Sequence, residues 1–109
     1  MGGIALESFS RGQLVCSRAG RDKGSWYVVV GSEGDDRLLV ADGKQRQAIN
    51  PKRKNRKHLQ PANLVIKEIK ECLDAGRLPT NSQLRRAIAQ FIKGEGFWDI
   101  GREEAGPDG

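Results

Sequence analysis

Positively charged side chains are concentrated in one short stretch of this chain, between positions 44 and 57. Seven of these fourteen residues are cations, and no acidic residue lies between Asp42 and Glu68. The cations are Lys44, Arg46, Lys52, Arg53, Lys54, Arg56 and Lys57. Such a run attracts phosphates through counterion release, and arginine adds bidentate phosphate contacts that lysine cannot make. The run therefore favours binding of a polyanion, with a solvated charged loop as the simpler alternative.

Three further cations lie at a predicted hairpin loop. They are Arg18, Arg21 and Lys23, and Asp22 is the one acid among them. A glycine bounds the loop, residues 20–24, at each end, which suits a tight connection between two strands. If the basic run leads into the last strand of a small barrel, it can lie beside this loop. The two groups would then present one cationic surface.

Two aromatic residues, Trp26 and Tyr27, open the strand that follows the loop. An aromatic side chain on such a surface can stack on an unpaired base. Successive side chains of a strand point to opposite faces, so one of the two must point inward. We take Trp26 as the candidate RNA contact.

Segments rich in β-branched and aromatic residues predict the strands that must position these cations. Strands are expected at 12–19, 25–31 and 37–41, with a possible short fourth strand at 45–50 and a last strand after the basic run. Short strands separated by frequent turns are typical of a small β-barrel. We therefore expect a mainly β protein with C-terminal helices, in which residues 11–61 form a barrel of about five strands.

After Pro61 the apolar residues follow a helical spacing. One apolar stripe consists of Val65, Ile66, Ile69, Cys72 and Leu73, and a second consists of Leu84, Ala87, Ile88, Phe91 and Ile92. Between the stripes, Thr80 and Gln83 form a capping-box pattern that begins a helix. Two amphipathic helices are expected over 62–93. The acidic, glycine-rich tail, 94–109, is expected to be disordered.

Charge is distributed unevenly along the 109-residue chain, whose net charge is +5. Residues 11–58 hold 12 Lys and Arg against 5 Asp and Glu, whereas residues 60–109 hold 7 against 8. This asymmetry indicates a basic N-terminal module that meets an anionic partner. No apolar run approaches the roughly 20 residues that a membrane span needs, and no secretory signal opens the chain. We expect a cytoplasmic monomer without a membrane partner.

Catalytic and metal chemistry find little support in the residue types. The single histidine, His58, and two distant cysteines, Cys16 and Cys72, do not make a zinc site, and the thiols are expected to be reduced. Residues 20–25 lack the Gly-Lys-Ser/Thr ending of a phosphate loop, and no nucleophile, histidine and acid form a recognisable set. We expect a non-enzymatic protein with no catalytic residue, metal or cofactor.

Residues 13–31 resemble a KOW motif, the hairpin unit of several ribosomal proteins and transcription elongation factors. Four segments carry a wider resemblance: SRAGRDKG at 17–24, LVADGKQR at 39–46, PKRKNRKHL at 51–59 and TNSQLRRAI at 80–88. Over about residues 11–93 the chain is similar to small KOW-domain RNA-binding proteins of Gram-positive bacteria and to the large-subunit ribosomal protein of the L fourteen-e type. The resemblance implies an SH3-like barrel that binds ribosomal or other structured RNA, followed by helices. Tyr27 stands near the place where many KOW motifs have a glycine.

Two functions from different classes remain open. The first is a protein that binds large-subunit ribosomal RNA, or assists its assembly, through shape and phosphate contacts, because RNA duplex grooves hide the base sequence from side chains. Its expected RNA contacts are Arg18, Arg21, Lys23, Lys44, Arg46, Lys52, Arg53, Lys54, Arg56, Lys57 and Trp26. The second is a protein-interaction module in which the barrel or the helix pair docks a ribosomal protein or RNA polymerase.

Overall fold

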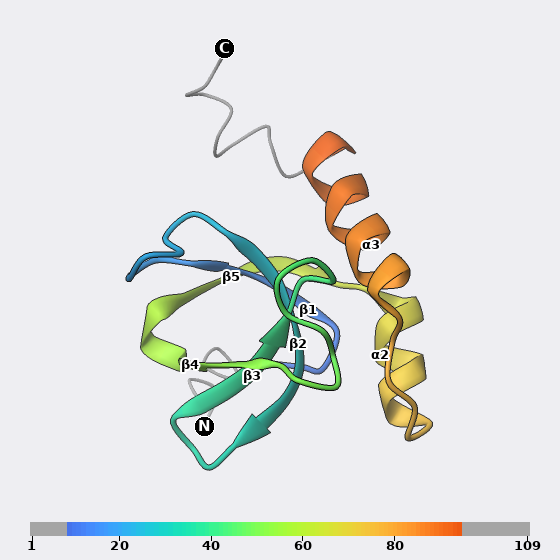
Figure 1. The fold of residues 1–109 in the computed structure, drawn as a ribbon, viewed down its shortest axis with the longest axis horizontal. Helices are drawn as coiled ribbons and strands as arrows, with labels where there is room; N and C mark the ends of the chain where they lie inside the picture. The colour runs from blue at the N-terminus through green and yellow to red at the C-terminus, as the bar shows by residue number, and fades with distance from the viewer. Residues whose placement is uncertain (1–8, 95–109) are drawn as a thin grey trace.

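The computed structural model describes residues 9–94 of the chain and contains one β-sheet followed by two α-helices (Figure 1). The strands are β1 (Gln13–Ser17), β2 (Trp26–Glu33), β3 (Arg37–Ala41), β4 (Lys52–Asn55) and β5 (Leu59–Val65). A 3-10 turn, η1 (Arg56–His58), joins β4 to β5, and the helices are α2 (Lys67–Asp74) and α3 (Asn81–Gly94). The prediction of a mainly β protein with two C-terminal helices is confirmed. Within residues 9–94, no helix has the length and apolar character to span a membrane.

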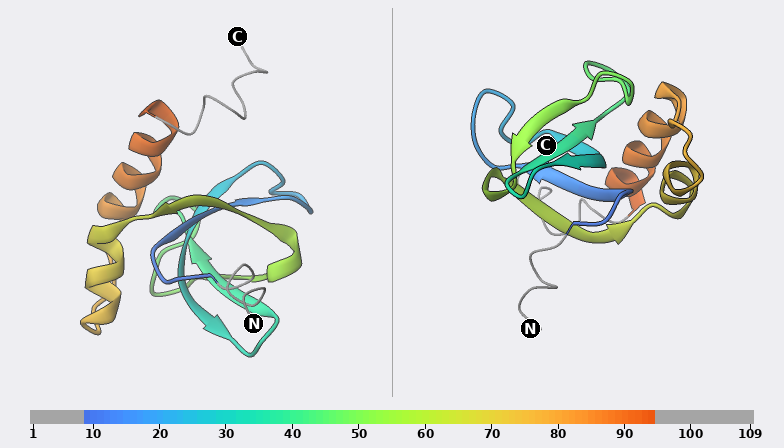
Figure 2. Two further views of the ribbon diagram at one scale, coloured as in Figure 1. Left: turned by 180° about the vertical axis from the view of Figure 1, so that it is seen from behind. Right: turned by 90° about the horizontal axis from the view of Figure 1, so that it is seen from below.

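The five strands form one antiparallel sheet in the order β4-β3-β2-β1-β5. Figures 1 and 2 show that the sheet curls strongly and that α2 and α3 lie together along one side of it. The two edge strands, β4 and β5, are consecutive in the chain and are connected through η1. Pro61 lies within β5, where an edge strand tolerates a residue without a backbone N–H.

Apolar side chains are buried on both faces of the sheet. Inside the curl, Val15, Tyr27, Val29, Leu38, Val40 and Leu59 form one buried cluster. On the helix side, Leu14, Val28, Ala41, Ala48, Ile69 and Leu84 form another. Because both faces of β2 are covered, its apolar residues run continuously from Trp26 to Val30 and do not alternate with polar ones.

The predicted strand at 45–50 is wrong, because this segment is a turn and the fourth strand is β4, inside the basic run itself. One oxygen of the Asp42 carboxylate accepts the backbone N–H groups of Lys44, Gln45 and Arg46, at 2.9, 3.0 and 3.0 Å. A side chain that captures consecutive N–H groups holds the backbone in a turn and removes those groups from a strand ladder.

The two predicted helices are confirmed, with a later start for the first of them. Val65 belongs to the predicted helical stripe but is the last residue of β5, and α2 begins at Lys67. The capping box is confirmed: the Gln83 backbone N–H donates to Thr80 Oγ1 at 3.1 Å, and the Thr80 N–H donates to Gln83 Oε1 at 2.8 Å. Apart from Gly94, which ends α3, the predicted disordered tail lies outside the described residues.

Candidate nucleic-acid interface

The hairpin loop between β1 and β2 is held against β4 by the side chain of Asp22. Lys52 Nζ donates to Asp22 Oδ2 at 2.9 Å, and Lys54 Nζ donates to Oδ1 at 3.0 Å. The Tyr27 hydroxyl donates to Oδ2 at 2.7 Å, and Ser17 Oγ lies 2.8 Å from Oδ1. One carboxylate therefore joins β1, the loop, β2 and β4. The expectation that the basic run lies beside the loop is confirmed at these two lysines.

The pKa values of Asp22 and Tyr27 are shifted in opposite directions. Burial alone would raise the pKa of Asp22, but hydrogen bonds from Tyr27, Lys52, Ser17 and Lys54 outweigh it and hold the pKa well below its usual range. Burial, and then the hydrogen bond to the Asp22 carboxylate, raise the pKa of Tyr27 far above its usual value. Asp22 is therefore ionised and Tyr27 is protonated at neutral pH.

We expect the absorbance of Tyr27 to report this pair directly, because the chain has one tyrosine. In an alkaline titration, tyrosinate absorbance of the folded protein should rise at higher pH than that of the protein unfolded in urea, since both burial and the Asp22 charge oppose loss of the phenolic proton. In Asp22→Asn, the difference in titration pH between the folded and the unfolded protein should become smaller but should not disappear, because Tyr27 remains buried. Coincident titrations of the folded and unfolded parent would contradict the arrangement.

The cations of the hairpin loop point to solvent around this anchored position. Arg18, Arg21 and Lys23 are exposed, and none of them forms an ion pair with another described residue. The backbone N–H of Arg18 donates to the carbonyl of His58 at 2.8 Å, which ties the base of the loop to η1 and places it next to exposed Lys57. The loop and η1 therefore form one basic edge.

Most cations of the basic run contact the protein itself. Lys54 is only 8% exposed, and its amine also donates to the carbonyl of Ala19 at 3.3 Å. Arg53 pairs with Glu33 at 2.6 Å. The Arg56 guanidinium donates to the carbonyl of Asp35 at 3.0 Å and lies 5.6 Å from the centre of the Phe9 ring. The run is therefore an ordered strand and turn, and Lys54 in particular is too buried to be a main contact for a ligand.

The remaining predicted contacts lie at the turn between β3 and β4 and at the start of β2. Lys44 is exposed, whereas Arg46 is half-buried. Trp26 is half-buried and packs on Phe91 of α3, with ring centres 5.1 Å apart and ring planes at 59°. The structure therefore places Trp26 and Lys44 beside α3, at a second surface separate from the basic edge of the hairpin loop and η1.

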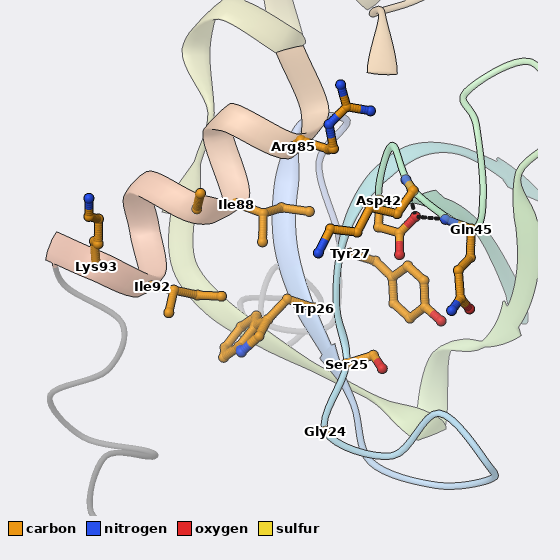
Figure 3. Close-up of a pocket in the computed structure, with 12 residues that line it drawn as sticks. Gly24, Ser25, Trp26, Tyr27, Asp42, Gln45, Arg85, Ile88, Ile92 and Lys93 are labelled. Carbon is orange, nitrogen blue, oxygen red and sulfur yellow. Dashed lines mark hydrogen bonds between the residues drawn. The ribbon is translucent and has the colours of Figure 1, made fainter. Parts of the chain in front are cut away.

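That place is a groove of about 710 Å³ between α3, the first residues of β2 and the turn that begins at Asp42 (Figure 3). Figure 3 shows Ile88 and Ile92 of α3 directed toward the strand that carries Trp26. Arg85 and Lys93, from the same helix, add two cations to the lining. Arg85 and Lys93 are not among the contacts predicted from the sequence, which does not connect them with Trp26 because they come from a different element.

Within residues 9–94, no group of three or more His, Cys, Asp or Glu side chains is arranged to hold a metal ion. Both cysteines, Cys16 and Cys72, are free thiols and half-buried. A comparison with protein-family models and one with curated proteins give no match to this chain.

Proposed function

We propose that this chain is a non-enzymatic RNA-binding protein that associates with large-subunit ribosomal RNA, and that its curled sheet acts as an SH3-like barrel of the KOW type. The anchoring of the hairpin loop by Asp22 carries the proposal. The Asp22 carboxylate fixes the loop backbone, while Arg18, Arg21 and Lys23 remain exposed to solvent. A loop whose backbone is already fixed loses less conformational entropy when its cations meet phosphates than a mobile loop does.

The proposed contact is made through phosphates and shape. Five of the predicted RNA contacts are exposed and form no ion pair with a described residue: Arg18, Arg21, Lys23, Lys44 and Lys57. Neutralising about five phosphates should lower RNA affinity by roughly 500-fold when salt rises from 50 to 200 mM. A surface that docks a protein through apolar contacts should change far less.

The test is a charge reversal at the loop, Arg21→Glu with Lys23→Glu. We expect affinity for purified large-subunit ribosomal RNA to fall by about a hundredfold or more, because two phosphate contacts are replaced by repulsion. Both side chains are exposed and have no ion pair with a described residue, so folding should be preserved. Fluorescence anisotropy with labelled RNA fragments measures the effect.

The matched control is Lys67→Glu with Arg77→Glu, which changes the net charge equally at two exposed positions in and after α2. We expect the control to lose much less affinity than the loop variant. Equal losses would mean that overall charge, and not the loop, determines binding. Salt-insensitive binding to large subunits that survives the loop reversal would favour the protein-docking function.

A further inference from the structure

The groove beside α3 is held in shape by contacts among the elements that line it. Arg85 Nη1 donates to the carbonyl of Gly43 at 2.8 Å, which fastens the turn after β3 to the helix. The Asp42 carboxylate organises the same turn through three backbone N–H groups. The Trp26 ring packs on the Phe91 ring of α3. Turn, strand and helix are therefore fastened to one another around the groove.

The lining combines an aromatic and apolar floor with positive charge. Trp26, Ile88 and Ile92 supply the floor, and Lys44, Arg85 and Lys93 supply three cations. Among the described residues, Asp42 is the one acid in the lining, and one of its oxygens already accepts three N–H groups. Tyr27 also lines the groove, and its hydroxyl donates a hydrogen bond to Asp22. The groove therefore favours an anion that carries a flat apolar group.

We propose that this groove binds an unpaired nucleotide of an RNA strand, with the base against Trp26 and the flanking phosphates at Lys44, Arg85 and Lys93. Aromatic side chains stack on unpaired bases of any sequence, and cations track the backbone on either side. The volume of about 710 Å³ lies within the range of small-ligand sites. Ser25 and Gln45, which also line the groove, add polar groups to it.

The inference rests on the proposed function and adds a single-stranded element to it. Gly24 and Ser25 line the groove and directly follow Lys23 of the hairpin loop. An RNA whose paired region contacts the loop can thus deliver an adjacent unpaired nucleotide to the groove. RNA is favoured over a peptide for two reasons. The lining holds three cations against one acid, which suits phosphates, and Trp26 offers an aromatic surface on which a base can stack.

Two adjacent substitutions on α3 test the site. Ala89 lines the groove, and Gln90 lies on the other side of the helix. Both are exposed, so Ala89→Glu and Gln90→Glu each add one negative charge without disturbing the core. The two variants and the parent carry Trp98→Phe, which leaves Trp26 as the single tryptophan. A short oligoadenylate and a poly(A)–poly(U) duplex are the probes.

We expect oligoadenylate to quench Trp26 fluorescence in the parent and in Gln90→Glu. In Ala89→Glu, affinity for the single strand should fall by about tenfold and quenching should be lost, in line with the usual energy of stacking one base on an aromatic side chain. Duplex affinity should change by less than about twofold. Should Ala89→Glu fold poorly, Lys44→Ala with Lys93→Ala is the second variant, with the same expected loss confined to single strands.

Several outcomes would overturn the inference. Equal behaviour of Ala89→Glu and Gln90→Glu, or absent quenching while the Arg21 and Lys23 reversal still abolishes RNA binding, would refute the groove and leave the proposed function standing. Quenching by an acidic peptide but not by RNA would assign the groove to a protein partner. If no RNA binds the parent, both proposals fail.

Discussion

Replacing Asp22 with alanine should lower the free energy of unfolding by about 3–5 kcal/mol, because it leaves the buried Lys54 amine without its counter-charge. The Asp22 side chain is only 13% exposed, so solvent cannot replace it as a partner. Tyr27 and Ser17 lose an acceptor at the same time. Total stabilities of small domains are about 5–15 kcal/mol, so the variant should be close to unfolding.

Urea denaturation of the full chain, followed by circular dichroism, measures the loss. Asp74→Ala is the matched control, since Asp74 also pairs with two cations, Arg11 and Lys70, but is 40% exposed. Exposed ion pairs contribute about 0–1 kcal/mol, so the control should be close to the parent. Similar losses in the two variants would show that the Asp22 pairs are no stronger than surface pairs.

The dependence of stability on pH in the acid range is a second test of the role of the Asp22 carboxylate. The folded state holds the pKa of Asp22 below its unfolded value, which is about 4. The stabilisation is therefore present above pH 4 and is lost as the pH falls toward the folded pKa. The parent should lose stability over this interval more steeply than Asp22→Ala, in which the carboxylate is absent.

Replacing Gly43 with alanine is the second substitution with a large expected effect. Gly43 has a φ of 79°, and an added Cβ would lie 2.5 Å from the backbone oxygen of Asn81 and 3.0 Å from Leu84 Cβ. The backbone conformation costs about 1–2 kcal/mol for alanine, and overpacking against α3 adds about 1–3 kcal/mol. We expect a loss of about 2–5 kcal/mol in the free energy of unfolding, measured by urea denaturation.

Gly34→Ala separates the two causes. Gly34 has a φ of 71°, but an added Cβ would meet nothing within 4 Å. This control should lose only about 1–2 kcal/mol in the free energy of unfolding, from the backbone conformation alone. If Gly43→Ala loses no more than Gly34→Ala, then α3 does not sit as closely on the turn as the structure indicates. In that case the groove beside α3 would also be wider than described.

Local spacing made most of the elements predictable. The apolar runs of β2 and β3, the two helical stripes and the capping box at Thr80 depend on residues near one another in the chain. The errors arose where a neighbour overrides the local pattern. The Asp42 side chain turns the segment expected as the fourth strand, and pairing of β5 with β1 extends a strand to Val65, into the expected first helix.

The sequence by itself determined the class of elements, their order and the excess of positive charge in the first part of the chain, because these follow from composition and short-range periodicity. It did not determine which cations face solvent. Lys52 and Lys54 are 30 and 32 residues from Asp22 in sequence, and only the folded sheet brings their amines within 3.0 Å of its carboxylate. The groove arises in the same way, since Trp26 and Lys93, which both line it, are 67 residues apart in the chain. Ion pairing and cavity shape depend on distances through space, and the tertiary structure alone decides those distances.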